Sequence, residues 1–497
     1  MKDPLSFAIL AAYYAVLAPL ALYGLHRVVL LVVARRPSPT APAPAKPSSL
    51  LPLVTVQLPL YNERYVARRL LDAVAGLDYP SERLEIQVLD DSTDDTTSIL
   101  RARVEELRAQ GLDVVLVHRC SRAGFKAGAL AAGLGVARGE LIVVFDADFL
   151  PPTDFLQRTV PCFVDPGVGM VQARWGHVNR GFSLLTRVQA LLLDAHFLIE
   201  HAARARAGCF FNFNGTAGVW RRSTIEDAGG WQHDTLTEDL DLSYRAQLRG
   251  CRFVFLDDLV APAELPVEIA ALRGQQRRWT RGSVQCLRKL GGALCRAPIP
   301  WRIRAEALAH LGANLCYPLM VALTLLLLPA MWVRRDVGFG LAWLDLPMLI
   351  AATGSLVAFY LTAAARAGTS RREAAVLLPV LMALGIGMSW HNARAALGGL
   401  VRRGGEFERT PKYDVRGRSD RWRDRRYRPR RNPRLTGEVV LAAYTLCVVG
   451  AALVGGMWWS LPFLLLFFAG YAYVLGLAAL ASHQRDSGGV GDAAAAV

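Results

Sequence analysis

The sequence reads LEIQVLDD at residues 84–91 and LIVVFDAD at residues 141–148. The apolar runs Leu84–Leu89 and Leu141–Phe145 have the length of strands, and aspartates follow each of them. Near-continuous runs of this kind suit strands that are covered on both faces of a sheet. Two more runs and three helical stretches complete the pattern: Leu53–Leu58, Val114–Val117, Tyr65–Ala75, Thr96–Gln110 and Lys126–Ala137. This order predicts βαβ units and a mostly parallel, Rossmann-like α/β sheet. Ligands of such sheets bind beyond the carboxyl ends of the strands, where the aspartates lie.

The composition predicts that this sheet is joined to membrane spans. The chain has 497 residues, 53% of them hydrophobic, and a mean hydropathy of +0.26. That value is high for a soluble protein and low for a bundle made only of membrane helices. We attribute the formal net charge of +15 to Lys and Arg beside the spans rather than to a nucleic-acid partner. The eight cysteines form no C-x-x-C pair, which indicates reduced thiols and argues against a disulfide framework.

One apolar run near the N-terminus, Phe7–Ala34, is long enough to cross a bilayer, and two arginines follow it. A cleaved signal peptide has a shorter core and a basic start, so we interpret this run as an uncleaved anchor. Positive residues gather on the cytoplasmic side of spans, which places the following domain in the cytoplasm. Four further spans are predicted in the C-terminal third: Leu311–Val333, Leu341–Ala365, Val439–Trp459 and Leu461–Leu480.

The segment Ala374–Arg403 is also apolar, but its first part is short for a span. Ten arginines between Arg416 and Arg434 belong in the cytoplasm, so an even number of crossings should separate them from the α/β domain. We therefore predict that Ala374–Arg403 lies in the interface or is re-entrant, while hydropathy alone allows a sixth span.

These observations divide the chain into seven parts. They are an N-terminal anchor (1–36), a Pro-rich linker (37–52), a cytoplasmic catalytic domain (53–300), transmembrane and interfacial helices (301–400), a basic cytoplasmic loop (401–437), two transmembrane helices (438–482) and a disordered tail (483–497).

Asp146 and Asp148 are candidates for a metal site because they are two positions apart at a strand end. If strand geometry persists, both carboxylates project to the same side and face one ion. A hard cation such as Mg²⁺ or Mn²⁺ takes carboxylate oxygens together with substrate phosphate oxygens, and offsets charge on a nucleoside diphosphate leaving group. The alternative is a helix cap at Asp148, since D-x-D is a common string.

Asp90 and Asp91 end the other apolar strand, and Asp94 and Asp95 follow them. Capping of the helix that begins near Thr96 explains the second pair well and the first pair less well. The first pair therefore predicts a carboxylate site beside the metal that holds a ribose, a base or a water molecule.

Glu238 and Asp239 follow Thr237 at the start of a predicted helix, Leu240–Leu248. Helix capping is one interpretation of this string. The other makes Asp239 the general base that takes a proton from an acceptor hydroxyl, which requires a carboxylate within hydrogen-bond reach. An inverting displacement needs one such carboxylate and no enzyme nucleophile.

The string QQRRW at residues 275–279 is the most distinctive in the chain. Arg forms paired hydrogen bonds with phosphate oxygens, and Trp279 offers a flat apolar face to a sugar ring. An amphipathic interfacial helix is the alternative, and both interpretations can hold at once. The string FERTPK at 407–412 is either a basic loop drawn to anionic lipid or a mobile loop that closes over a nucleotide through Thr410 and Lys412.

Taken together, these motifs resemble those of family 2 glycosyltransferases of the cellulose synthase type. From about Leu53 to Lys412 the chain looks most like the cellulose synthase-like A group of mannan and glucomannan synthases and its bacterial relatives. The resemblance implies a GT-A catalytic domain facing the cytoplasm, a membrane channel beside it, and inversion at the anomeric carbon. It also implies a multi-pass protein of the plasma (inner) membrane whose partners are a nucleotide-sugar donor, a nascent glycan and the bilayer, without nucleic acid.

Matching motifs carry the family's roles to this sequence. The resemblance implies nucleotide-sugar contacts at Tyr61, Glu63, Asp90, Asp91, Lys126, Asp146, Gln275, Arg278, Thr410 and Lys412. It implies acceptor contacts at Phe213, Gly215 and Trp279, a metal at Asp146 and Asp148, and catalysis by Asp239 with Glu238 beside it.

The sequence also departs from the family. Arg409 replaces a Val of the family's gating loop, and Pro411 occupies its variable position. One predicted span before the catalytic domain, and nothing that resembles a C-terminal cyclic-dinucleotide-binding domain, argue against a regulated bacterial cellulose synthase.

The sequence thus predicts a processive, inverting β-glycosyltransferase that extends a β-1,4-linked chain from GDP-mannose, UDP-glucose or both. One alternative is a lipid glycosyltransferase of the ceramide type, which adds a single sugar. Another is a membrane transporter with a nucleotide-binding domain, although the sequence has neither a P-loop nor matching halves.

Overall fold

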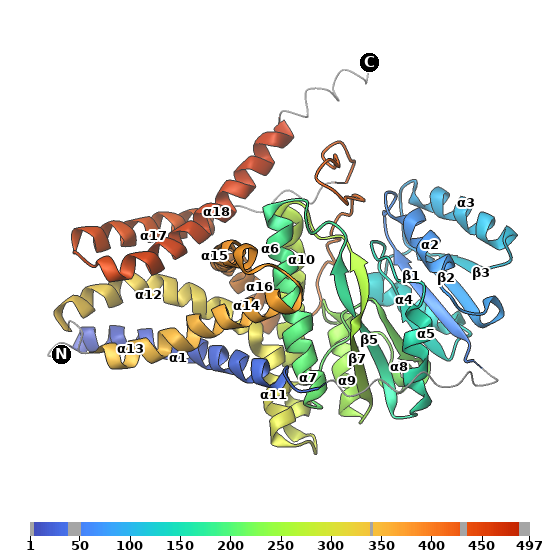
Figure 1. The fold of residues 1–497 in the computed structure, drawn as a ribbon, viewed down its shortest axis with the longest axis horizontal. Coiled ribbons are helices and arrows are strands. Elements are labelled where there is room, and N and C mark those ends of the chain that lie inside the picture. The colour runs from blue at the N-terminus through green and yellow to red at the C-terminus, as the bar shows by residue number, and fades with distance from the viewer. Residues whose placement is uncertain (1–3, 38–50, 338–340, 428–434, 487–497) are drawn as a thin grey trace.

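A computed structural model describes residues 4–37, 51–337, 341–427 and 435–486, and Figure 1 shows their arrangement. An α/β domain lies at one end of the molecule and a bundle of long helices at the other. Most of the predicted linker, the last part of the arginine run and the predicted tail beyond residue 486 lie outside the described residues.

One seven-stranded sheet forms the α/β domain, in the order β3-β2-β1-β4-β6-β5-β7. The strands are β1 Val54–Leu60, β2 Leu84–Asp90, β3 Asp113–His118, β4 Leu141–Val144, β5 Val168–His177, β6 Gly218–Arg221 and β7 Arg252–Ala263. Only β6 runs antiparallel to its neighbours, β4 and β5. The predicted mostly parallel α/β sheet is confirmed, and the four predicted strands match β1 to β4 within two residues at each end.

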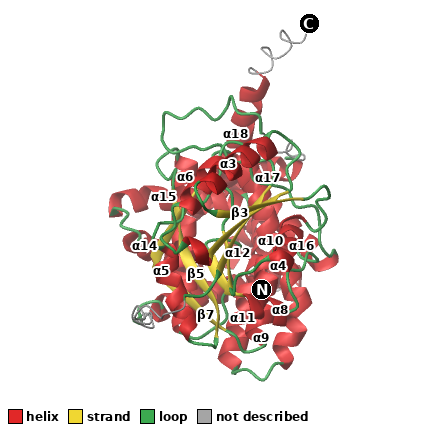
Figure 2. Ribbon diagram, turned by 90° about the vertical axis from the view of Figure 1, so that its right-hand side faces the viewer, coloured by secondary structure: helices red, strands yellow, loops and turns green. Residues whose placement is uncertain are grey.

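Helices cover both faces of this sheet, as Figure 2 shows. They are α2 Ala67–Ala75, η1 Ser81–Arg83, α3 Thr96–Ala109, α4 Phe125–Val136, α5 Phe155–Thr159, η2 Val160–Val164, α8 Arg222–Asp227 and α9 Glu238–Leu248. In β4, Leu141 and Val143 belong to one buried cluster, and Ile142 and Val144 belong to the other. Successive side chains of a strand point to opposite faces, so this four-residue strand fills two cores at once.

Two helical layers connect the sheet to the bundle. They comprise α6 Leu184–Ala195, the π-helix η3 His196–His201, α7 Ala202–Arg206, α10 Ile269–Arg296, α11 Trp301–Gly312 and η4 Ala313–Leu315. Leu185 and Leu191 of α6 pack with Ile269 and Leu272 of α10 in one buried cluster. Two helices of the bundle, α15 (Arg371–Gly387) and α18 (Leu461–Asp486), also contribute to this cluster. In Figure 1 these helices stand between the sheet and the bundle.

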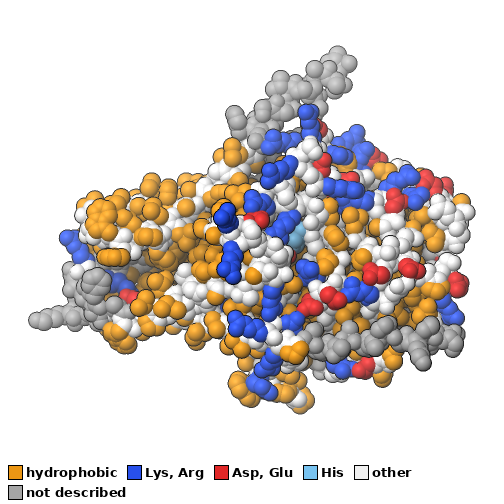
Figure 3. Space-filling view, in the orientation of Figure 1, with side chains coloured by type: hydrophobic (Ala, Val, Ile, Leu, Met, Phe, Trp, Pro, Cys, Tyr) orange, Lys and Arg blue, Asp and Glu red, His pale blue; other side chains and the backbone are white. Residues whose placement is uncertain are grey.

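The bundle contains the helices that the sequence predicts as spans. Its elements are α1 Pro4–Val33, α12 Cys316–Val337, α13 Ala342–Leu349, η6 Ile350–Gly354, α14 Ser355–Arg366, α15 Arg371–Gly387, α16 Ser389–Val401, α17 Thr436–Val454, η7 Trp458–Ser460 and α18 Leu461–Asp486. Within the described residues, five helices are long and apolar enough to cross a membrane, or six if the bent pair α15 and α16 counts as one span. All five coincide with predicted spans, and the surface of the bundle is largely hydrophobic in Figure 3.

Two details of the bundle differ from or refine the sequence-based spans. The first C-terminal span begins at Trp301, earlier than predicted, because α11 continues into α12. In the segment 374–403, α15 and α16 meet at a bend of 49°, which fits both a broken span and a re-entrant pair, so the interfacial or re-entrant placement stays a prediction. At the end of α15, a Cβ on Gly387 would lie 2.1 Å from the Gly470 carbonyl oxygen of α18, so these helices cross in close contact.

Candidate active site

A cavity of about 190 Å³ opens at the carboxyl ends of the parallel strands. Its walls come from the loops after β1, β2 and β4, from β5, α9 and α10, and from the segment 407–412. The predicted site residues that line it are Tyr61, Glu63, Asp91, Lys126, Asp146, Asp148, Gly215, Glu238, Asp239, Gln275, Arg278, Trp279, Thr410 and Lys412. Motifs as far apart in sequence as Tyr61 and Lys412 therefore meet in one place.

Two predicted site residues lie away from the cavity lining. Asp90 is fully buried, and its carboxylate accepts hydrogen bonds from the Ser92 amide (2.9 Å) and the Thr97 hydroxyl (2.7 Å). Phe213 is also fully buried and packs edge-on against Trp220. Adjacent residues at a strand end face opposite ways, so Asp91 reaches the cavity and Asp90 does not. Asp90 and Phe213 therefore lie behind the cavity lining, and their predicted contacts with the nucleotide sugar and the acceptor stay predictions.

Asp146 and Asp148 both reach the cavity, but not through the strand geometry that the sequence predicts. Strand β4 ends at Val144, and a turn closed by the Phe149 amide and the Asp146 carbonyl (3.1 Å) carries both aspartates. Lys126 Nζ lies 2.5 Å from Asp146 Oδ1, and Lys412 Nζ lies 2.7 Å from Asp148 Oδ2. Each carboxylate therefore has its own ammonium partner.

Two carboxylates at the start of α9 have an environment that suits a base. Burial raises the pKa of Asp239 to about 7, and the neighbouring Glu238 charge adds to the effect. Burial raises the pKa of Glu238 as well, while the Lys126 charge opposes the rise. A carboxyl group whose pKa lies near neutral pH can both accept a proton and release it again at that pH, as a general base must do.

Gly215 provides the space that Asp239 occupies. Its φ of +82° lies in the left-handed region, which L side chains rarely adopt. A Cβ at this position would lie 3.0 Å from Asp239 Oδ2 and 3.5 Å from Lys126 Nζ. A glycine here lets the backbone approach both groups, and the Gly215 carbonyl accepts a hydrogen bond from Lys126 (2.8 Å).

Helix α10 holds the segment 405–415, hereafter the covering loop, over the cavity. Arg278 donates to the Thr410 hydroxyl (3.2 Å) and to the Glu408 carbonyl, and its guanidinium lies 4.6 Å from the Phe407 ring centroid. Phe407 in turn stacks on Phe125 at the start of α4 (6.1 Å between centroids). The QxxRW helix thus binds the loop and lines the site at the same time.

Arg409, the departure from the family pattern, forms a buried ion pair across the cavity. Its Nε and Nη2 lie 2.8 and 2.9 Å from the two carboxylate oxygens of Glu63. Burial raises the pKa of Glu63 to about 7, although the Arg409 charge acts to lower it. The loop is closed in this arrangement, and the 190 Å³ beneath it is smaller than the ~300–1,000 Å³ of typical ligand pockets. The covering loop thus narrows the cavity, and the Arg409–Glu63 ion pair holds it in this position.

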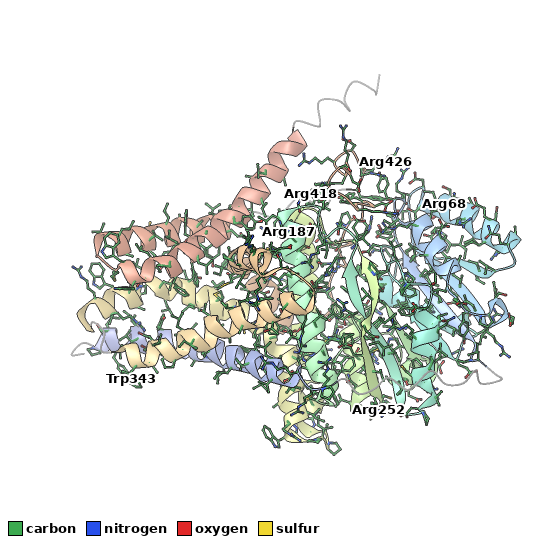
Figure 4. All side chains as sticks on the ribbon, in the orientation of Figure 1. Arg68, Arg187, Arg252, Trp343, Arg418 and Arg426 are labelled. Carbon is green, nitrogen blue, oxygen red and sulfur yellow. The ribbon has the colours of Figure 1, made fainter. Side chains whose placement is uncertain are left out.

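The basic segment 416–427 follows the covering loop and lies on the α/β domain rather than free in solution. Arg418 Nε donates to the Gly181 carbonyl (3.0 Å), and the Arg426 amide donates to the Tyr65 hydroxyl (3.0 Å). The Tyr427 hydroxyl bonds to Asp94. Figure 4 shows Arg418 and Arg426 on this segment above the domain.

Several cavity residues carry no motif and escape sequence analysis. They are Arg122, Trp175, His177 and Glu264. Glu264 binds the covering loop through the Tyr413 amide (2.9 Å), and its own amide donates to Asp148 (3.0 Å). Only proximity in sequence to Lys126 could have drawn attention to Arg122.

A chain of polar contacts leads from the cavity to the first membrane helix. Asn214 contacts His196 (3.1 Å), and His196 contacts Glu200 (3.1 Å). Arg204 links Glu200 (3.8 Å) to Glu306 of α11 (2.9 Å), and Glu306 meets His26 of α1 (2.6 Å). The π-helix η3 carries part of this chain, and such bulges occur frequently at functional sites.

The donor set suits a hard divalent cation, although it is small. Among the described residues, no group of three or more His, Cys, Asp and Glu side chains is placed to hold a metal ion. Two carboxylates at one cavity wall nonetheless fit Mg²⁺ or Mn²⁺, which keep several waters and bind substrate phosphates. Asp146 and Asp148 would be the protein ligands.

The chain is similar in sequence to plant enzymes. Residues 52–282 match the model of the "glycosyltransferase like family 2". Glucomannan 4-beta-mannosyltransferase 7 of Arabidopsis thaliana is 43% identical over 255 residues, which are 50% of this chain and 46% of that protein. Glucomannan 4-beta-mannosyltransferase 1 of Oryza sativa subsp. japonica is 44% identical over 248 residues, 49% of this chain and 48% of that protein. The matched region thus spans about half the length of these relatives.

Among solved structures, one similar chain is the mannosyltransferase PcManGT from Pyrobaculum calidifontis in complex with GDP-Man and Mn²⁺. The two chains share 25% sequence identity, and their structural match has a TM-score of 0.49. The match covers 80% of this chain and 98% of the mannosyltransferase chain. The family match and the strand order observed here agree with the GT-A type of sheet.

Proposed function

Because residues 52–282 form a family 2 glycosyltransferase domain, homologous to those of plant glucomannan 4-beta-mannosyltransferases, we propose that this protein is a membrane-embedded, processive and inverting β-glycosyltransferase. It transfers a hexose from GDP-mannose or UDP-glucose to a growing β-1,4-linked polysaccharide. The observation that carries the proposal is the meeting of Asp239, Asp146, Arg278 and Trp279 in one cavity beside the membrane helices.

The reaction is a single displacement at the anomeric carbon. Asp239 takes the proton of the acceptor hydroxyl, whose oxygen forms the new glycosidic bond while the bond to the diphosphate breaks and the configuration inverts. Lys126, Arg278 and Lys412 line the same cavity and stabilise the negative charge of the departing diphosphate. When bound at Asp146 and Asp148, Mg²⁺ or Mn²⁺ would offset the same charge.

Two tryptophans support an acceptor site near the helices that lead to the membrane. Trp279 lies on α10, with the Trp175 ring 6.5 Å away, and both line the cavity. Aromatic faces bind the apolar faces of sugar rings, so these two tryptophans support a glycan that leaves toward the bundle. Lys and Arg side chains gather where the bundle meets the domain (Figure 3), which supports a cytoplasmic catalytic domain at the plasma (inner) membrane.

A transfer assay on purified protein in nanodiscs tests the proposal. Radiolabelled GDP-mannose and UDP-glucose are supplied separately with Mg²⁺ or Mn²⁺, and then with a chelator. We expect label in an ethanol-insoluble polymer that is lost on chelation and in Asp239→Asn, and retained in the control Asp258→Asn, whose side chain is 71% exposed. Label only in an organic-extractable lipid would overturn the polymer and indicate a lipid glycosyltransferase.

A further inference from the structure

Arg122 is a cation inside the cavity that the proposed chemistry does not use. It lies in the loop between β3 and α4, and its guanidinium carbon is 3.5 Å from the Tyr61 ring centroid and 5.1 Å from that of Phe125. Its Nε is buried and has no hydrogen-bond partner in the part of the chain that the structure describes. No ion pair joins Arg122 to a carboxylate of the described residues either.

The other cations around the cavity are engaged. Lys126 and Lys412 contact Asp146 and Asp148, and Arg409 contacts Glu63. Asp91, whose charge acts on Arg122, is held by two nitrogens of Arg119. Burial lowers the pKa of the Arg122 guanidinium, yet arginine keeps its charge in proteins. A buried donor without an acceptor is unfavourable, so the ligand of this cavity is expected to supply the acceptor.

The position of Arg122 identifies which part of a nucleotide sugar it meets. The diphosphate belongs at the other end, where Lys126, Lys412 and Arg278 converge near the D-x-D turn. Tyr61 is one of the aromatic residues that line the cavity, and we take it as the ring on which a base stacks, with Arg122 on its face. A base that stacks on Tyr61 therefore displaces the guanidinium from the ring and brings it to the edge of the base.

Resting on the proposed function, we infer that Arg122 is a specificity-determining residue that recognises the guanine of a guanosine diphosphate sugar. Guanine presents O6 and N7 as adjacent acceptors, which the two-pronged guanidinium matches with paired hydrogen bonds. Adenine places a donor beside N7, and uracil offers one carbonyl on that edge. Asp91 also lines the cavity, and its charge acts on Arg122, although two nitrogens of Arg119 hold its carboxylate.

Equilibrium binding of nucleotides to the full chain in nanodiscs tests this inference without any transfer. GDP, UDP and ADP are titrated calorimetrically at a fixed Mg²⁺ concentration against wild type, Arg122→Met and Arg122→Lys. The Met variant removes the charge from a side chain of similar length. The Lys variant keeps the charge but lacks the paired N–H donors of the guanidinium. Arg101→Met, at an exposed position of α3, is the matched control.

Wild type and the control are expected to bind GDP about tenfold or more tighter than UDP, which is the discrimination that one paired Arg contact supplies. Both Arg122 variants are expected to lose this preference, mainly through weaker GDP binding. Equal weakening of GDP and UDP would overturn the inference and assign Arg122 to the phosphates, as would a wild type without base preference. If Arg122→Met does not fold, Arg122→Lys decides alone. The two proposals can fail separately. If the wild-type protein makes no polymer in the transfer assay but still prefers GDP in the titrations, the proposed function is refuted and this inference stands.

Discussion

At the scale of single residues, the two carboxylates of α9 make the proposed reaction dependent on pH. Asp239 acts as a base only when ionised, and burial with the Glu238 charge raises its pKa to about 7. We therefore expect kcat/KM to fall roughly tenfold per pH unit below that value and to level off above it. Glu238→Gln removes one source of the raised pKa, so the inflection should move to lower pH. An inflection that stays in place in this variant would contradict the assignment.

The effect of the same group on stability has the opposite sign. The folded state binds the Asp239 proton more tightly than the unfolded state, because its pKa is raised above the ordinary value. The stabilising contribution is therefore complete at low pH and is lost as pH rises through about 7. The ionised form of Asp239 is the active base, and it is also the form that burial destabilises. The enzyme therefore gains activity and loses stability over the same pH range, a combination found at functional sites.

Most of the candidate site could be predicted residue by residue from spacing, because its members follow strand ends or begin helices. Asp91 and Asp146 each come after an apolar run whose end the sequence marks clearly. Spacing alone could not separate Asp91 from Asp90, since that choice depends on which way the last strand residue faces. Arg122 could not be predicted, because a single arginine in a loop has no periodicity to indicate its direction.

At the scale of elements, the contact between α15 and α18 depends on two glycines. A Cβ on Gly387 meets the Gly470 backbone at 2.1 Å, whereas a Cβ on Gly385 of the same helix has nothing within 4 Å. Gly387→Val should therefore destabilise the protein by about 1–3 kcal/mol through overpacking. Gly385→Val should leave the Tm in detergent nearly unchanged. Equal effects of the two substitutions would show that helix propensity, rather than contact, accounts for the loss.

The helices and strands that could be predicted are those whose sequences contain a long apolar run, either because the element is buried on both faces or because it lies in the membrane. Strands β1 to β4 and helices α2 to α4 have this signal, and their predicted ends are correct within two residues. Strand β6 has only four residues, and β7 is interrupted by Asp257 and Asp258, so neither stands out in sequence. The first turns of the span at Trp301 carry charged residues that pair inside the protein, which hides them from a hydropathy pattern.

At the scale of the whole molecule, the family match over residues 52–282 agrees with the predicted glycosyltransferase domain, and the activity of the whole protein stays a proposal. The sidedness of the domain stays a prediction. Cys120 and Cys295 are exposed on the catalytic half, and Cys447 is exposed on α17 within a candidate span. An impermeant maleimide should label the first two cysteines in inverted vesicles only, and Cys447 in neither orientation. Labelling of Cys120 in right-side-out cells would place the catalytic domain outside.

The contact between His26 and Glu306 has a consequence for how the N-terminal helix is understood. A helix that only delivered the enzyme to the bilayer would be interchangeable with any other tether of equal length. Here α1 supplies the last partner of a polar chain that begins at Asn214 on the cavity wall. A foreign tether would leave Glu306 without its His26 partner, and Arg204 bound to a carboxylate that has lost one of its contacts. The N-terminal helix is thus a structural part of the catalytic unit, and modular exchange of it should cost activity even when the protein still reaches the membrane.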